Sequence, residues 1–173
     1  DAKIDSLYEG TTAIQAQDFF FRKIVRDQGA ALGHLVTQIE SFIDSEEARP
    51  ELVDARKQLA TAVDDLQAWV ATMTGYLIDS QQSARELYRV GLESVPFLLA
   101  VGDLLIGWLL LRQAEIALAA LDRDPAATDR AFYNGKVAAA TFFVKNVLPR
   151  LTADHGIAAN VDLAVMDLRE EAF

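Results

Sequence analysis

The sequence predicts an all-α protein, an antiparallel bundle of about five to six helices. Apolar residues recur every three to four positions along most of the chain, as in amphipathic helices, and the alternation typical of strands fails nearly everywhere. Only 4 prolines occur among 173 residues, while alanine and leucine are abundant. This composition favours helix, and the length allows one domain with a substantial core.

The expected helices follow from these apolar patterns and from local stop signals. They cover residues 12–28, 30–45, about 50–79, 81–121, 127–153 and 161–171. Gly29 and Gly156 are expected to end the first and the fifth helix. Pro96 is expected to kink or break the fourth helix, and Pro149 to disturb the last turns of the fifth.

The first helix carries two further signals. Thr12-Ala13-Ile14-Gln15 has the T-x-x-Q form of a capping box, which predicts a helix start at this point. One apolar stripe is expected to face the core, and its residues are Ile14, Phe21, Ile24 and Val25, widened by Phe19 and Phe20.

The third helix carries a heptad pattern. Its first row is Leu52, Leu59, Leu66 and Met73, and a second row three residues behind is Ala55, Ala62, Trp69 and Tyr76. Such a pattern is typical of long helices packed nearly antiparallel. It suits a coiled coil as well as an intramolecular bundle, and the short connections favour the bundle.

The most apolar stretch, residues 95–111, touches the lower length limit for a membrane span. Asp103 lies in its middle, and a charge at a bilayer centre costs roughly 2.5–3.5 kcal/mol on insertion scales. We therefore expect no transmembrane span but a central bundle helix. In that helix Gly102 and Gly107 would allow close helix approach, and Asp103 would need a hydrogen-bonded partner.

Composition excludes several classes of protein. The net charge is -10 and the basic residues are scattered, which argues against a nucleic-acid partner. The absence of cysteine excludes a disulfide framework, a thiol nucleophile and a Cys-ligated metal. His34 and His155 are the only histidines and match no zinc or di-iron pattern, so no metal site is expected. We expect a cytoplasmic protein, with peripheral membrane association left open.

The strongest chemical signal is the segment Tyr8-Glu9-Gly10-Thr11-Thr12-Ala13-Ile14-Gln15. Glu9 offers a carboxylate for proton abstraction, and Gly10 lets backbone approach a substrate closely. Thr11 and Thr12 lead into a helix N-terminus, where free N–H groups attract anionic groups. Burial beside an apolar substrate would raise the pKa of Glu9, whereas the helix terminus would lower it.

This segment, with Arg22-Lys23 following on the same helix, resembles the C-terminal signature of the acyl-CoA dehydrogenases. The resemblance implies that Glu9 removes the α-proton of a fatty acyl-CoA while FAD accepts the β-hydride, which gives a trans-2-enoyl-CoA. It further implies that Gly10 touches the substrate thioester region and that Arg22 and Lys23 face the CoA phosphates.

For the cofactor, the same resemblance implies that Thr11, Thr12 and Ala13 approach the flavin and that Gln15 adds a polar contact. It implies FAD as cofactor, an electron-transfer flavoprotein as acceptor, a role in fatty-acid β-oxidation and a homo-oligomer.

The rest of the chain resembles the extra helical domain of the longer bacterial acyl-CoA dehydrogenases. Residues 104–111, 133–140 and 146–149 carry this likeness. It implies that residues 1–28 end a catalytic helical domain and that residues 29–173 form an extra C-terminal helical bundle. The family's N-terminal helical domain and β-domain, which hold most of the FAD site, are not in this sequence.

We therefore expect this chain alone to be inactive and to function with the rest of the same polypeptide. A second hypothesis stays open, a non-catalytic helical module for protein interaction or acyl-CoA binding. The sequence determines neither the acyl-chain length nor the role of the extra domain.

Overall fold

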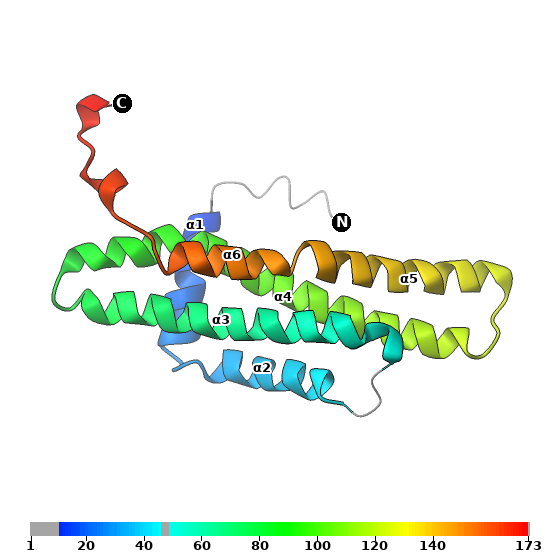
Figure 1. Cartoon of the computed structure of the whole chain (residues 1–173). Helices are drawn as coiled ribbons and strands as arrows, with labels where there is room; N and C mark the ends of the chain where they lie inside the picture. The colour runs from blue at the N-terminus through cyan, green and yellow to red at the C-terminus, as the bar shows by residue number, and fades with distance from the viewer. Residues whose placement is uncertain (1–10, 46–48, 173) are drawn as a thin grey trace.

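The computed structural model describes residues 11–45 and 49–172 (Figure 1). These residues form the helices α1 (Thr12–Asp18), α2 (Ala30–Ile43), α3 (Val53–Asp79), α4 (Leu87–Leu121), α5 (Ala127–Asn146) and α6 (Pro149–Ala158). A π-helix, η2 (Phe19–Val25), continues α1 directly, and short 3-10 turns are η3 (Pro50–Leu52), η4 (Ala84–Glu86), η5 (Ala164–Asp167) and η6 (Glu170–Ala172). The described residues contain no strand, which confirms the all-α prediction.

Successive helices from α2 to α5 run in opposite directions, and α6 continues in the direction of α5 (Figure 1). In the same view, α1 and η2 cross the long helices at a steep angle. The helix α4 packs against α3, α5 and α1, and α3 packs against α2 and α6. The bundle is therefore organised around the pair α3 and α4.

The heptad pattern of α3 forms the centre of the core, as predicted. All four residues of the first row are buried, and Ala55, Ala62 and Trp69 of the second row are buried as well. Tyr76 is half-buried, and its hydroxyl donates a hydrogen bond to the Ala158 carbonyl oxygen at 2.8 Å. This bond attaches the end of α6 to α3.

Of the two outcomes predicted for Pro96, a kink or a break, the break is wrong, because α4 is continuous from Leu87 to Leu121. Pro96 lies on the exposed side of the helix, so water can reach the Leu92 carbonyl that loses its intrahelical donor. By length and composition alone α4 could cross a membrane. It packs instead on three other helices, as expected of a central bundle helix.

Close approach at α4 depends on one of the two predicted glycines. A Cβ atom placed on Gly107 would lie 3.1 Å from both Cδ atoms of Leu148, whose side chain is buried at the α5–α6 junction. A Cβ atom on Gly102 would meet nothing within 4 Å. The prediction is therefore confirmed for Gly107 and wrong for Gly102, which lies away from the helix interface.

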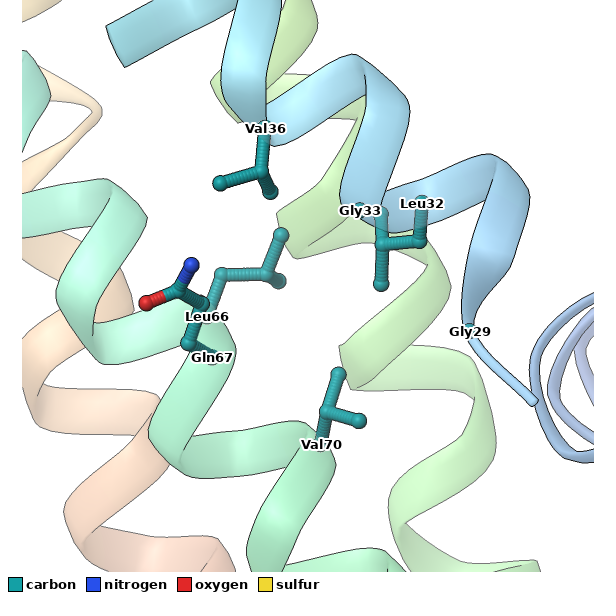
Figure 2. Close-up of a pocket in the computed structure, with 7 residues that line it drawn as sticks. All are labelled: Gly29, Leu32, Gly33, Val36, Leu66, Gln67 and Val70. Carbon is teal, nitrogen blue, oxygen red and sulfur yellow. The ribbon is translucent and has the colours of Figure 1, made fainter.

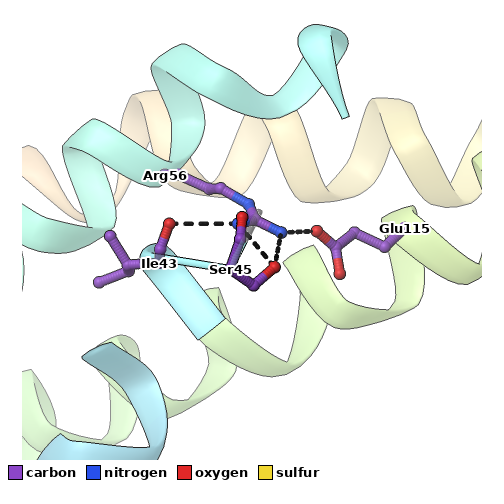
Figure 3. A network of polar contacts seen from close by, with 4 residues as sticks. All are labelled: Ile43, Ser45, Arg56 and Glu115. Carbon is purple, nitrogen blue, oxygen red and sulfur yellow. Dashed lines mark hydrogen bonds and ion pairs between the residues drawn. The ribbon is translucent and has the colours of Figure 1, made fainter. Parts of the chain in front are cut away.

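A buried arginine joins the end of α2 to α3 and α4 (Figure 3). The Arg56 Nη1 donates hydrogen bonds to the Ile43 carbonyl oxygen at 3.1 Å and to the Ser45 carbonyl oxygen at 3.4 Å, and Nη2 pairs with the Glu115 carboxylate. The guanidinium also lies 4.5 Å from the centre of the Phe42 ring. Burial lowers the pKa of Arg56, and the ion pair and carbonyl oxygens compensate its charge.

The C-terminal region differs from the prediction in three respects. The expected helix over 127–153 ends at Asn146, and Pro149 begins the separate helix α6, since proline is well tolerated at a first helical position. Gly156 lies inside α6 and does not end a helix. Residues 161–171 form no α-helix but contain the 3-10 turns η5 and η6, and Arg85 from η4 contacts the Leu163 carbonyl oxygen and the Asp167 carboxylate.

Candidate active-site segment

The structure places Thr11, Thr12, Ala13 and Gln15 at the exposed start of α1. The predicted capping box is wrong, since no side chain caps this helix. The backbone N–H of Gln15 donates to the Thr11 carbonyl oxygen at 2.8 Å, so the helix starts one residue earlier than the box requires. Glu9 and Gly10, the predicted base and its neighbour, lie outside the described residues.

The first turn of α1 offers hydrogen-bond donors to its surroundings. In an α-helix the first N–H groups have no acceptor within the helix, and here those of Thr12, Ala13 and Ile14 lie in an exposed turn. The side chain of Ile14 is 66% exposed, which contradicts its predicted place in the core stripe. The turn is therefore a polar surface with one apolar side chain.

The register of the first predicted helix changes at Phe19, where η2 begins. The N–H of Arg26 donates to the Phe21 carbonyl oxygen at 3.0 Å, and the N–H of Gly29 donates to the Ile24 carbonyl oxygen at 2.8 Å, both five residues back. Phe20 and Ile24 are buried, as predicted, and together with the buried Ala16 they recur every four residues along one side of these two segments, away from Ile14. The sequence analysis missed this change, and its only signal is the run Phe19-Phe20-Phe21.

The rod formed by α1 and η2 ends at Val25, three residues before the predicted end of this helix, and Gly29 follows in a turn with a left-handed backbone. Its φ is 74°, a conformation that glycine adopts without steric cost.

The basic pair lies at the opposite end of this rod from the first turn. Arg22 and Lys23 are both exposed on η2, roughly 15 Å along the helix from Thr12 at 1.5 Å per residue. Arg22 forms an ion pair with Asp18 at 2.9 Å. The structure thus places the predicted flavin-facing and CoA-facing residues on one continuous rod, without bringing them together.

An aromatic cluster fixes this rod to the bundle. The Phe97 ring on α4 lies 6.1 Å from Phe19, 6.2 Å from Phe20 and 5.8 Å from Trp69 on α3, measured between ring centres. Phe97 is fully buried, and such tilted and edge-to-face pairs add to the stabilisation from apolar burial. The sequence analysis did not single out Phe97, because a phenylalanine within an apolar helix gives no separate signal.

Two small apolar hollows lie beside the rod. One, of about 180 Å³, lies between α2 and α3, where Leu32 and Val36 face Leu66 and Val70 (Figure 2). The other, of about 160 Å³, lies between η2, α2 and α4 and includes Lys23. Ligand sites are usually about 300–1,000 Å³, so neither hollow is large enough for an acyl-CoA or a flavin.

Two acidic side chains of α4 have raised pKa values. Burial raises the pKa of Glu93, and the neighbouring charge of Asp154 raises it further. Burial also raises the pKa of Asp103, while Arg150 opposes this shift and Asp154 adds to it. The hydrogen-bonded partner expected for Asp103 is not found among the described residues. Its carboxylate is half-exposed, so water can solvate it.

The histidines take no part in a shared site. His34 is exposed on α2, and its Nε2 lies 2.9 Å from the amide nitrogen of Gln38. His155 lies on α6. In residues 11–45 and 49–172 no group of three or more His, Asp or Glu side chains is placed to hold a metal ion.

The fold and this segment define a class of protein, a helical bundle that carries a crossing N-terminal helical segment, α1 and η2, attached through aromatic packing. Comparison with known proteins identifies the family. A family model described as "Acetyl-CoA dehydrogenase C-terminal like" matches residues 35–169, and the chain belongs to this family.

The curated relatives agree with this assignment. The chain is 57% identical over its whole length to the broad-specificity linear acyl-CoA dehydrogenase FadE5 of Mycobacterium tuberculosis. It is 33% identical to a butyryl-CoA dehydrogenase of Syntrophomonas wolfei, again over its whole length, and 33% identical over 90% of its length to the 3-methylmercaptopropionyl-CoA dehydrogenase of Ruegeria pomeroyi. It spans 28%, 27% and 25% of these relatives, respectively.

Proposed function

We propose that this chain is the C-terminal part of an FAD-dependent acyl-CoA dehydrogenase and that Glu9 is its catalytic base. The observation that carries the proposal is the match to FadE5 over the whole length of this chain, which includes the segment from Tyr8 to Gln15. The names of the three relatives described above all denote dehydrogenases that act on acyl-CoA thioesters. The division into residues 1–28 and 29–173 remains part of this proposal.

In the proposed reaction Glu9 takes the α-proton of the acyl thioester, and the β-carbon loses a hydride, which leaves a trans double bond between the two carbons. FAD, when bound, supplies the acceptor for that hydride. Gly10 lets the backbone approach the thioester, because it has no side chain. Arg22 and Lys23 supply positive charge for the CoA phosphates, and the Asp18 carboxylate holds Arg22 in place.

The first turn of α1 fits one edge of a flavin site. Its exposed N–H groups and the hydroxyls of Thr11 and Thr12 can donate hydrogen bonds to polar ring atoms, and Gln15 can add a further contact. The hollows of this chain are too small to enclose the cofactor or the substrate. The remaining walls therefore belong to the rest of the same polypeptide, and this chain alone is expected to be inactive.

The same proposal includes the electron acceptor, the location and the oligomeric state of the protein. The reduced enzyme passes its electrons to an electron-transfer flavoprotein, and the protein acts as a cytoplasmic homo-oligomer in β-oxidation. The acidic net charge of -10 suits a partner surface that carries basic residues.

The test uses the full-length protein that contains this chain, loaded with FAD and free of oxygen. Acyl-CoA of several chain lengths is added, and bleaching of the flavin absorbance is followed in wild type, Glu9→Gln and the control Glu40→Gln, which changes an exposed glutamate of α2. We expect bleaching in wild type and control. In Glu9→Gln the rate should fall about 10²–10⁴-fold, the usual contribution of a general base.

Failure would be equally clear. A protein that binds no flavin, or a folded Glu9→Gln variant that bleaches as fast as wild type, would refute the proposal. The alternative of a non-catalytic helical module would then stand.

A further inference from the structure

The outward face of α4 carries an apolar stripe that none of the helices described by the structure covers. We call it the outer stripe, and it consists of Tyr88, Leu92, Leu99, Ile106 and Leu109. These side chains are between 39% and 59% exposed. Their spacing of three, four or seven residues places them on one side of the helix, over roughly 30 Å at 1.5 Å per residue.

The outer stripe is unusual for a surface in contact with water. Scattered apolar side chains need no explanation, but an aligned row of large ones marks an interaction surface. The opposite side of α4 carries Phe97, Leu104 and Leu111, which are buried in the core. The helix is thus apolar on both sides, and only one side has its partner within this chain.

The charges on α4 argue against a lipid surface as the partner. Between Arg89 and Arg112 the helix has no lysine or arginine, and its only charged residues are Glu93 and Asp103. Helices that lie on anionic membranes use basic residues on their polar side. The partner of the outer stripe is therefore a protein surface that is apolar in its centre.

The position of the rod formed by α1 and η2 indicates which protein surface covers the outer stripe. Leu105, which lies one helical turn before Leu109, lines a hollow together with Phe19 and Lys23, so the rod lies at one edge of the outer stripe. The exposed Ile14 and the first turn of α1 belong to the same rod, which the chain enters directly after the proposed base. The relatives are about four times as long as this chain, and the match covers their C-terminal part.

We infer that the outer stripe of α4 docks on the flavin-binding portion of the same polypeptide, an inference that rests on the proposed function. The rod and the outer stripe then form one continuous surface, and docking holds the first turn of α1 against the flavin site. The extra helical domain thereby acts in positioning the start of this rod.

The test is a site-specific photo-crosslink in the full-length, FAD-loaded protein. The photoreactive residue p-benzoylphenylalanine replaces Leu99 of the outer stripe in one variant and Phe142 of α5 in the control. The two positions are similarly exposed in this chain, at 59% and 67%. A third variant carries the probe at Ile106, so a folding defect at one position does not decide the result.

We expect the Leu99 and Ile106 variants to give an intramolecular product at monomer mass on a denaturing gel. Mass spectrometry should join either position to a peptide that precedes this chain, with a yield several-fold above that of the Phe142 variant. A product at dimer mass would assign the outer stripe to a second copy. Equal yields at all positions, or no product at positions 99 and 106, would show that no specific docking occurs.

Flavin bleaching by acyl-CoA in the same preparations separates the two proposals. Normal bleaching without the intramolecular crosslink would overturn the docking inference alone. A protein without bound flavin would overturn the proposed function and, with it, the identity of the docking partner.

Discussion

Replacing Gly107 by alanine tests how closely α4 approaches the α5–α6 junction. Alanine favours helix over glycine by about 1 kcal/mol, so the change would stabilise α4 if the site were open. The new Cβ would lie 3.1 Å from both Cδ atoms of Leu148, closer than ordinary van der Waals contact. Leu148 is buried and cannot turn out into water.

Forcing extra atoms into a packed core costs about 1–3 kcal/mol. After the gain in helix propensity, Gly107→Ala should destabilise the chain by roughly 0–2 kcal/mol. Gly102→Ala is the matched control on the same helix, because its Cβ would meet nothing within 4 Å. It should stabilise the chain by about 0.5–1 kcal/mol.

The assay is urea unfolding of both variants, followed by far-ultraviolet circular dichroism. A double-mutant cycle assigns the cause, since Gly107→Ala should become stabilising in a Leu148→Ala background that removes the clash. If the two glycine variants changed the free energy of unfolding in the same direction and by the same amount, the close approach at Gly107 would be refuted.

Three further outcomes follow from the contacts. Arg56→Ala should lower the free energy of unfolding by about 1.5–3 kcal/mol, because it removes a buried donor from the Ile43 and Ser45 carbonyl oxygens and from the partly exposed Glu115 carboxylate; urea unfolding measures this. Phe97→Ala should cost about 3–5 kcal/mol and release the rod formed by α1 and η2, so trypsin should cut faster at Lys23. Glu93→Gln should stabilise the chain at neutral pH, because burial raises the pKa of Glu93 and makes its charged form unfavourable; unfolding measured across pH tests this.

The sign of the last effect follows from proton binding. A carboxyl group with a raised pKa in the folded state binds its proton more tightly there, so wild-type stability falls as pH rises from the ordinary to the raised pKa of Glu93. The advantage of Glu93→Gln should therefore be present above this window and disappear below it. A pH-independent difference would contradict the argument.

For the proteolysis experiment on Phe97→Ala, the control is Phe142→Ala, an exposed residue of α5 whose loss should leave the cutting rate unchanged.

Side-chain periodicity predicted the parts of the fold that depend on burial. The heptad rows of α3 are regular over four repeats, and tertiary packing buries the row that contains Leu59, Leu66 and Met73. The same reasoning recognised α4 as a central helix, since Asp103 and two glycines do not suit a membrane span. Trp69, a member of the second heptad row, is fully buried, as the pattern predicted.

Predictions that rested on short local sequence signals were wrong in several places. The capping-box pattern at Thr12 was displaced by one residue, and no local sequence rule anticipated the π turn at Phe19. Pro149 began a helix where it was expected to disturb one, because its missing N–H is harmless at a first position. The last predicted helix is absent, and its segment instead contacts Arg85, which lies about 80 residues away in the sequence.

The sequence predicted which residue types the candidate site contains and their order along the chain, but not their contacts in space. The pattern from Tyr8 to Gln15 indicated a base, a glycine and a helix start, and the helix start at Thr12 was confirmed. The role of Phe97 in attaching this helix depends on contacts between segments about 80 residues apart, for which the sequence has no local pattern. Outside the described residues Glu9 stays a prediction.

The most direct test of the proposed catalytic role is hydrogen exchange at the α-carbon of a bound acyl thioester. The full-length, FAD-loaded protein is incubated in deuterated water with an acyl-CoA analogue that cannot lose a β-hydride, and deuterium uptake is measured by mass spectrometry. We predict uptake in wild type and in Glu40→Gln, and a rate about 10²–10⁴-fold lower in a Glu9→Gln variant that still binds FAD and the analogue. Uptake at the wild-type rate in Glu9→Gln would contradict the assignment of the base.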